Sequence, residues 1–383
     1  YQRRVRGVDM NFTFNKTTQK IECDSQISEN IYCLRYSNIP SDLTSEFEKI
    51  EYIKQFEYTL ITVADRITIE TDLHGQIPLY ITDNQLTTAF SLQAMNIKPG
   101  RTVLSPDLQE LSYEPPTFGA RHYNFHARLQ EFIHETFRFH KNNENETCLL
   151  LLSGGVDSAL LFQVLIEAQI PFQSVSVSFK PDSDDRKAVE KLLAETQILM
   201  RQKNLKKLFR HKFVLVSEDR FKQTLPGLQK NIRGCRVMDA NLAAVWYHAA
   251  FGQPAKVVIS GLGPDEYCGC YARFKQQMSV EQKLVKIQEA ISGINSRNIQ
   301  RDFQIGKIMG KCFVYPYLDA KISQQFVYLR QNAFDEELMN KWVIRKLLKE
   351  FGYSSEIFDR SKKAAQFGSG SAVVLGGNGY DFV

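Results

Sequence analysis

Two short loops hold the side chains of this chain that could do chemistry. The first, Ser153-Gly-Gly-Val-Asp-Ser158, follows the apolar run 148–152 and precedes the amphipathic stretch 159–168. A strand that turns through Ser-Gly-Gly into a helix makes an anion site, because glycine lets the backbone approach a phosphate and the first helical amides lack partners. Asp157 would repel a bare phosphate, so it favours Mg²⁺ between carboxylate and phosphate. The alternative is an ordinary turn that Asp157 caps. The expected contacts to a nucleotide are Ser153, Gly154, Gly155, Val156, Asp157 and Ser158.

The second loop, Ser260-Gly-Leu-Gly-Pro-Asp-Glu266, presents two adjacent carboxylates after another apolar run. Two neighbouring carboxylates can divide labour, with one on a metal and one toward a reacting amine or carboxylate. An acidic pair at a helix start is usually only a cap, so this motif is specific only together with the first loop. We expect Asp157 and Asp265 to bind the metal, and Gly261 and Gly263 to line the nucleotide site.

The elements that position both loops alternate between strand and helix. Strands are predicted at 148–152, 172–179, 212–217 and 256–260, and helices at 156–168, 184–203 and 237–251. Such alternation predicts a doubly wound α/β fold, with a parallel sheet covered on both faces and ligands at the carboxyl ends of the strands. Both loops lie at such ends. Residues 280–363 are predicted to be mostly helical, with an extended interruption at 312–319.

The first part of the chain is predicted to form a smaller antiparallel β domain. Strand-like segments occur at 58–64, 66–70, 78–81 and 86–90, separated by turn residues. Pro115-Pro116 with Gly119 marks a linker. We therefore predict two domains, 1–118 and 119–383, and a helix at 125–140 in the second.

Composition excludes several classes of protein. With 43% hydrophobic and 24% charged residues, the 383-residue chain is typical of a globular protein. The net charge of +5 does not require nucleic acid, and the basic run 201–212 is interpreted as a solvated helix face. No apolar run is long enough to span a membrane. Seven cysteines without zinc spacing indicate free thiols in a reducing, intracellular compartment. That compartment is the cytoplasm, or the mitochondrion if a targeting segment is missing before Tyr1.

The two loops also resemble known motifs. Ser153-Gly-Gly-Val-Asp-Ser158 resembles the pyrophosphate loop (PP-loop) of the N-type ATP pyrophosphatases, and it is not a Walker A motif. The stretch 260–273 resembles the asparagine synthetase motif Ser-Gly-x-Gly-x-Asp-Glu…Gly-Gly-Tyr-x-Arg, with Cys270 in place of the second glycine. Lys362-Lys-Ala-Ala-Gln-Phe-Gly-Ser369 is similar to the terminal motif of the asparagine synthetase domain-containing protein 1 branch of that family.

This resemblance implies a reaction and roles for residues. The family uses ATP with Mg²⁺ to convert aspartate into β-aspartyl-adenylate, releases pyrophosphate, and lets ammonia displace AMP. By resemblance, Glu266 is the base for the incoming amine and Lys363 (or Lys362) holds the pyrophosphate. Ser176-Val-Ser-Phe179 resembles the family's second strand, which makes Ser178 a further expected nucleotide contact.

The first part of the chain resembles the family's glutaminase domain in degenerate form. Arg6-Gly-Val-Asp9 and the stretch 72–80 match its frame. Such a glutaminase needs a cysteine at the very start, whose free amine acts as base. The first cysteine here is Cys23, and the glutamine-binding segment Asn-Gly-Glu-Ile-Tyr-Asn is absent. We therefore expect an amidotransferase remnant without glutaminase activity.

The composition of the segment 303–314 is consistent with a second, non-catalytic function. Where the family has polar residues, this chain has Phe303, Ile308, Met309, Cys312 and Val314. Charges buried near a site are costly unless paired, and their joint replacement by apolar side chains is typical of a core with no chemistry to support. The first function is an ATP-dependent, AMP-forming carbon–nitrogen ligase with aspartate and ammonia as substrates. The second is a pseudoenzyme, a catalytically inactive subunit that acts as a scaffold beside other proteins of a larger complex.

Overall fold

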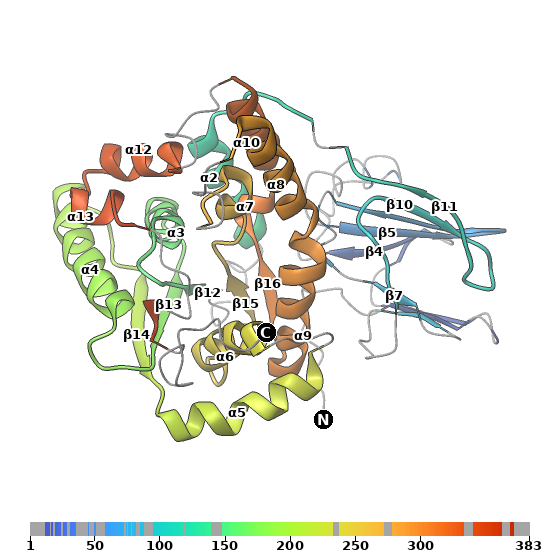
Figure 1. The fold of residues 1–383 in the computed structure, drawn as a ribbon, viewed down its shortest axis with the longest axis horizontal. Helices are drawn as coiled ribbons and strands as arrows, with labels where there is room; N and C mark the ends of the chain where they lie inside the picture. Colours follow the sequence, from blue (N-terminus) through green and yellow to red (C-terminus); the bar gives the residue numbers. More distant parts are fainter. Residues whose placement is uncertain are drawn as a thin grey trace.

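A parallel β-sheet whose strand order reverses at its middle strand organises the larger part of the molecule (Figure 1). The computed structural model describes residues 12–15, 17, 20–23, 26–28, 31–35, 45, 50, 58–72, 74, 76–77, 79–81, 85–87, 95–117, 119–138, 148–232, 237–271, 278–332, 340–361 and 368–370. In this part of the chain the sheet order is β14 (Phe209–Leu215), β13 (Phe172–Ser178), β12 (Cys148–Leu151), β15 (Val257–Ile259) and β16 (Cys312–Val314). Neighbouring strands are parallel throughout.

Helices cover both faces of this sheet. The connections α3 (Val156–Glu167) and α4 (Asp184–Gln202) lie on one side in Figure 1, and α5 (Glu218–Asn231), α6 (Val237–Ala250) and α9 (Gln300–Met309) lie on the other. Ser183 begins α4 by accepting a hydrogen bond from the Arg186 amide, and two acidic residues follow in its first turn. The predicted doubly wound α/β fold is confirmed.

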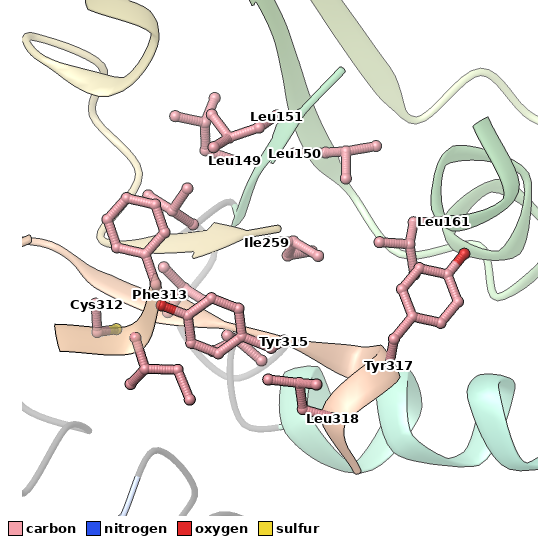
Figure 2. Close-up of a cluster of buried hydrophobic side chains, with 14 of the residues drawn as sticks. Leu149, Leu150, Leu151, Leu161, Ile259, Cys312, Phe313, Tyr315, Tyr317 and Leu318 are labelled. Atoms are coloured by element: carbon pink, nitrogen blue, oxygen red, sulfur yellow. The ribbon is translucent and has the colours of Figure 1, made fainter. Parts of the chain in front are cut away.

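The core of the sheet is built from the residues that the apolar runs predict. All four residues of β12 are buried, as are all three of β15 and of β16. Figure 2 shows Leu149 on the same side of the sheet as Phe313, and Leu150 on the other side with Ile259, so both faces of these three strands are apolar. The 310 turn η4 (Pro316–Leu318) follows β16 and is buried as well.

The first part of the chain forms two antiparallel sheets, which lie on the right in Figure 1. One has the order β2-β1-β8-β7-β9 and the other β11-β10-β6-β5-β4-β3. The prediction of antiparallel β-structure here is confirmed, whereas the division at 118 and 119 stays a prediction. The strands are β1 (Phe12–Asn15), β2 (Lys20–Cys23), β3 (Gln26–Ser28), β4 (Ile31–Arg35), β5 (Tyr58–Val63), β6 (Ile67–Thr71), β7 (Tyr80–Ile81), β8 (Gln85–Thr87), β9 (Met95–Asn96), β10 (Arg101–Leu104) and β11 (Glu110–Glu114).

The remaining helices pack around the carboxyl end of the sheet. Helix α2 (Phe125–Arg138) is fixed by a buried pair, in which Arg128 donates to both oxygens of Asp319 at 3.0 and 2.7 Å. The same carboxylate accepts two amides at the start of α10. The others are α7 (Pro264–Cys268), α8 (Val280–Ser292), the π-helical turn η3 (Asn295–Ile299), α10 (Ala320–Asn332), α12 (Trp342–Phe351) and α13 (Ser355–Phe358). None of the described helices is long and apolar enough to cross a membrane.

Two expectations about elements were wrong. The strand predicted at 212–217 begins at Phe209, because the Phe209 ring packs against Phe162 and Phe172. The basic run 201–212 therefore spans the end of α4 and most of β14, and is not one helix face. The extended interruption predicted at 312–319 is confirmed for 312–314, which form the strand β16, and it ends before the 310 turn η4.

A buried turn of the first part of the chain contacts the helices behind the second loop. His74 is 2% exposed, and its Nε2 lies 2.9 Å from the hydroxyl of Tyr267 on α7. Asn295 donates to the His74 carbonyl at 2.9 Å. Within the turn, Asp72 accepts hydrogen bonds from the His74 and Gln76 amides. Burial lowers the pKa of His74 to about 3.

This lowered pKa predicts acid sensitivity. Between about pH 6.5 and 3 the unfolded state binds a proton that the folded state does not, so the free energy of unfolding falls as pH falls. From pH 7 to 5, His74 alone should contribute a loss of about 2 kcal/mol. His211 and His248, whose pKa values burial lowers to about 4, act in the same direction. Urea unfolding of a His74→Gln variant at both pH values should show a loss smaller by that amount.

The control for this prediction is His134→Gln, because His134 is exposed on α2. Its loss of stability between the two pH values should equal that of the wild type. If the His74→Gln and wild-type proteins lose the same free energy on acidification, His74 is not buried in its neutral form.

Candidate functional site

The two predicted loops meet at the point where the strand order reverses. The chain leaves β12 toward β13 on one side and later returns to β15 on the other, and in doubly wound sheets the carboxyl ends of such strands are where ligands bind. A Cβ on Gly261 would lie 3.3 Å from the Cβ of Asp157, so the loops are in contact. Tyr317 donates to the Asp157 carbonyl at 2.8 Å, and Figure 2 shows its hydroxyl beside Leu161 of α3.

The first loop has the backbone geometry of an anion cradle. Gly154 has φ +73°, and Gly155 is the residue before α3, where no side chain caps the helix. Asp157 therefore lies inside the first turn and is not the cap. The Ser158 hydroxyl donates to the Gly155 carbonyl at 3.0 Å and accepts from the Ser153 amide at 3.2 Å. The amides at the start of α3 carry the positive end of the helix dipole, to which an anion can bind.

A lysine lies between the two carboxylates. The Nζ atom of Lys341 is 2.5 Å from Asp157 Oδ2 and 2.6 Å from Asp265 Oδ1, and the lysine is 3% exposed. Burial lowers the pKa of Lys341, but the charges of Asp157 and Asp265 outweigh this effect and raise its pKa well above its usual value. The ammonium is therefore charged, and it neutralises part of the acidic pair.

This arrangement tests the expected metal site. Mg²⁺ binds oxygen ligands at about 2.0–2.1 Å, so an ion shared by these two carboxylates would stand where the ammonium stands. With Lys341 in this position the pair does not fit Mg²⁺. No group of three or more His, Cys, Asp or Glu side chains that could hold a metal occurs within the described ranges.

Glu266 lies beside this cluster in a network of its own. It is 1% exposed, and its Oε1 accepts hydrogen bonds from Tyr271 at 2.5 Å and from Asn298 at 3.1 Å. Burial first, and then the charges of Glu266 and Asp265, raise the pKa of Tyr271 well above its usual value. The phenol therefore stays protonated and donates a hydrogen bond to the carboxylate. A carboxylate held in this way can accept a proton from an incoming amine.

The other predicted residues lie close to the loops or outside the described residues. Ser178 ends β13, and its hydroxyl donates to Ser183 at 2.8 Å and also to the Lys180 carbonyl. Gly263 has φ +126°, and a Cβ there would lie 2.9 Å from Leu318, so this glycine serves packing on η4. Val156 is in the core. Lys362, Lys363, Arg273 and the motif at residues 6–9 lie outside the described residues.

The sequence did not point to several residues of the site. Lys341 belongs to no motif of the sequence, and Tyr271, which lies within the matched stretch 260–273, was given no role there. Arg360 also reaches the cradle, since it donates to the Ser153 carbonyl at 3.3 Å and to Asp185 at 2.9 Å. The one available signal was a lysine at the start of α12, where the helix dipole disfavours a cation.

The shape of the cradle makes Gly154 sensitive to substitution. A Cβ there would lie 2.8 Å from that of Ala188, at a φ that alanine rarely adopts. Gly154→Ala should lower the free energy of unfolding by about 2–4 kcal/mol, and Ala188→Gly should restore part of it. The control is Gly227→Ala, because no atom lies within 4 Å of the added Cβ. In urea unfolding, this variant should have a free energy of unfolding about 0.5–1 kcal/mol higher than the wild type. If Gly154→Ala has the same free energy of unfolding as the wild type, this backbone geometry is wrong.

Removing the ammonium should destabilise the fold. Lys341→Met removes an ammonium that contacts two largely buried carboxylates, and loss of one partner of a buried pair costs about 3–5 kcal/mol. The matched control is Lys346→Met on the same helix, whose side chain is 60% exposed; its change should stay within about 0.5 kcal/mol. Equal stability of the two variants in urea would show that Lys341 is not engaged by the carboxylates.

Comparison with known proteins places this site in a family. The family described as asparagine synthase matches residues 140–332. Asparagine synthetase domain-containing protein 1 from Bos taurus is 30% identical over 149 residues, which cover 36% of this chain and 23% of that protein. This chain thus spans about a quarter of the length of the curated relative that it matches.

Solved structures with some likeness include NMN synthetase from Francisella tularensis, with 15% identity and a TM-score of 0.27 over 66% of this chain and 95% of that one. NH3-dependent NAD synthetase from Campylobacter jejuni has 13% identity and a TM-score of 0.26 over 63% and 97%. The family match covers half of the chain and contains both loops with the whole parallel sheet. The chain belongs to the asparagine synthase family.

Proposed function

We propose that this chain binds ATP at the loop 153–158 and uses it to amidate a carboxylate with ammonia, without glutaminase activity. The observation that carries the proposal is the contact between the uncapped start of α3 and the loop that presents Glu266, at the switch point of the sheet. Membership of the asparagine synthase family supports ATP as the nucleotide and aspartate as the carboxylate.

The reaction would take two steps. An oxygen of the substrate carboxylate attacks the α-phosphorus of ATP, and the bond from that phosphorus to the pyrophosphate oxygen breaks. Ammonia then attacks the carbonyl carbon of the acyl-adenylate, and AMP leaves. The loop amides at the start of α3 would hold the pyrophosphate, since they are donors at a positive helix end.

Glu266 is the group best placed to take the proton that ammonia loses. Its carboxylate is buried, and Tyr271 and Asn298 fix its orientation through Oε1. A fixed base in a dry environment supports proton transfer without reorganisation of solvent. Lys363 stays a proposal for the second cation on the pyrophosphate.

Calorimetry and a pyrophosphate assay test this function. ATP should bind to the purified protein, and pyrophosphate release should require ATP and a carboxylate from a panel of amino acids that includes aspartate. Glu266→Gln should keep ATP binding and lower amide formation by about a hundredfold. Ser153→Asp should weaken ATP binding by about tenfold or more, because the new anion repels the phosphates. The control Ser112→Asp, which puts the same charge at an exposed position of β11, should bind ATP within about threefold of wild type.

The second candidate function is the catalytically inactive scaffold. It is favoured by Lys341 between the acidic residues, and by the burial of Phe303, Cys312 and Val314 in the core. The apolar segment is not uniformly core, because Ile308 is 43% exposed. Absence of both ATP binding and pyrophosphate release would leave the scaffold. ATP binding without release for any carboxylate would exclude the ligase but retain the nucleotide site.

A further inference from the structure

We infer that Lys341 is a built-in cation that takes the place of a divalent metal between Asp157 and Asp265, so that this site binds its ligand without Mg²⁺. The claim that ATP binds here without a metal rests on the proposed function. The claim that Lys341 replaces the metal does not.

The first step is the position of the ammonium. One nitrogen atom contacts a carboxylate oxygen of each loop, at 2.5 and 2.6 Å. The carboxylates themselves are 15% and 14% exposed, so both are largely withdrawn from water. A divalent ion that bridged the same two oxygens would compete with the lysine nitrogen for both of them. The two cations exclude each other by size and by charge.

The second step is that the backbone holds the lysine there. Lys341 has φ +60°, a left-handed conformation that is uncommon for a side-chain-bearing residue. Its carbonyl accepts hydrogen bonds from the Ile344 and Arg345 amides, so it is the first residue of the α12 turn. Helix α12 packs on α3, and its residues Ile344 and Leu348 are in the core. The ammonium is thus anchored by a packed helix and not by a surface loop.

The third step concerns charge. An ammonium supplies one positive charge where Mg²⁺ would supply two, so a phosphate ligand needs cations elsewhere. Two arginines lie near the first loop, since Arg360 contacts it and Arg345 feels the charge of Asp157. Arg345 donates to the carbonyls of Phe358 and Arg360, and Arg360 donates to the Ser153 carbonyl and to Asp185.

Mn²⁺ binding followed by electron paramagnetic resonance tests the inference, with Mn²⁺ alone as the probe. The wild-type protein should show no bound Mn²⁺ that depends on Asp265. Lys341→Met should bind Mn²⁺ at least about tenfold more tightly than the wild-type protein does. Lys341→Met combined with Asp265→Asn should lose this gain in affinity. Lys341→Gln serves if circular dichroism shows that the methionine variant is unfolded.

Two results would overturn the inference. One is Mn²⁺ bound to the wild-type protein and released by Asp157→Asn or Asp265→Asn, which needs no lysine variant to fold. The other is a folded Lys341 variant that gains no Mn²⁺. Where ATP binds, its affinity in EDTA should equal that in Mg²⁺ within about threefold, and a larger loss in EDTA also contradicts the inference. Failure of ATP binding alone removes the proposed function but leaves the Mn²⁺ result standing.

Discussion

The buried ion cluster of Asp157, Asp265 and Lys341 is the constraint on which the rest of the site depends. Withdrawing an ion from water costs several kcal/mol, and only a close opposite charge offsets it. The two loops can therefore bring their carboxylates together only while α12 holds its ammonium between them. Three segments that are far apart in the sequence are thereby fixed relative to one another. The same contacts define the chemistry of the site, because they decide which cation the carboxylates face.

The sheet topology explains why those segments meet. In a doubly wound sheet, the loops after the two strands at the switch point diverge to opposite faces and leave a crevice between them. Here the strands are β12 and β15. The loop after β12 needs Gly154 because it passes close to α4, at Ala188 and Val189, before it enters α3. The loop after β15 needs Gly261 because it passes beside Asp157. Glycine in these loops therefore reflects crowding as much as ligand binding.

Local patterns in the sequence predicted the sheet and the contact between the loops. Each apolar run indicates a buried strand at its own position, and each glycine-containing stretch indicates a turn at its own position. The cluster needed non-local information. Lys341 lies far from both carboxylates in the chain, and only the packing of α12 on α3 brings it to them. Helix α5 was missed because it is mostly polar and contains Pro226. The strand β14 was placed too late because Phe209, amid basic residues, joins an aromatic cluster that no local pattern reveals.

The contact between His74 and Tyr267 gives the first part of the chain a role that does not depend on glutaminase chemistry. Tyr267 follows Glu266 on α7, and its ring also stacks on Phe326 of α10 at 5.4 Å. A neutral His74 can share a hydrogen bond with the phenol without bringing a charge into the core. The buried turn thus fixes the far side of the short helix that carries Asp265 and Glu266. The β-rich part of the chain is therefore joined by buried hydrogen bonds to the helix that carries the acidic pair and to the turn η3.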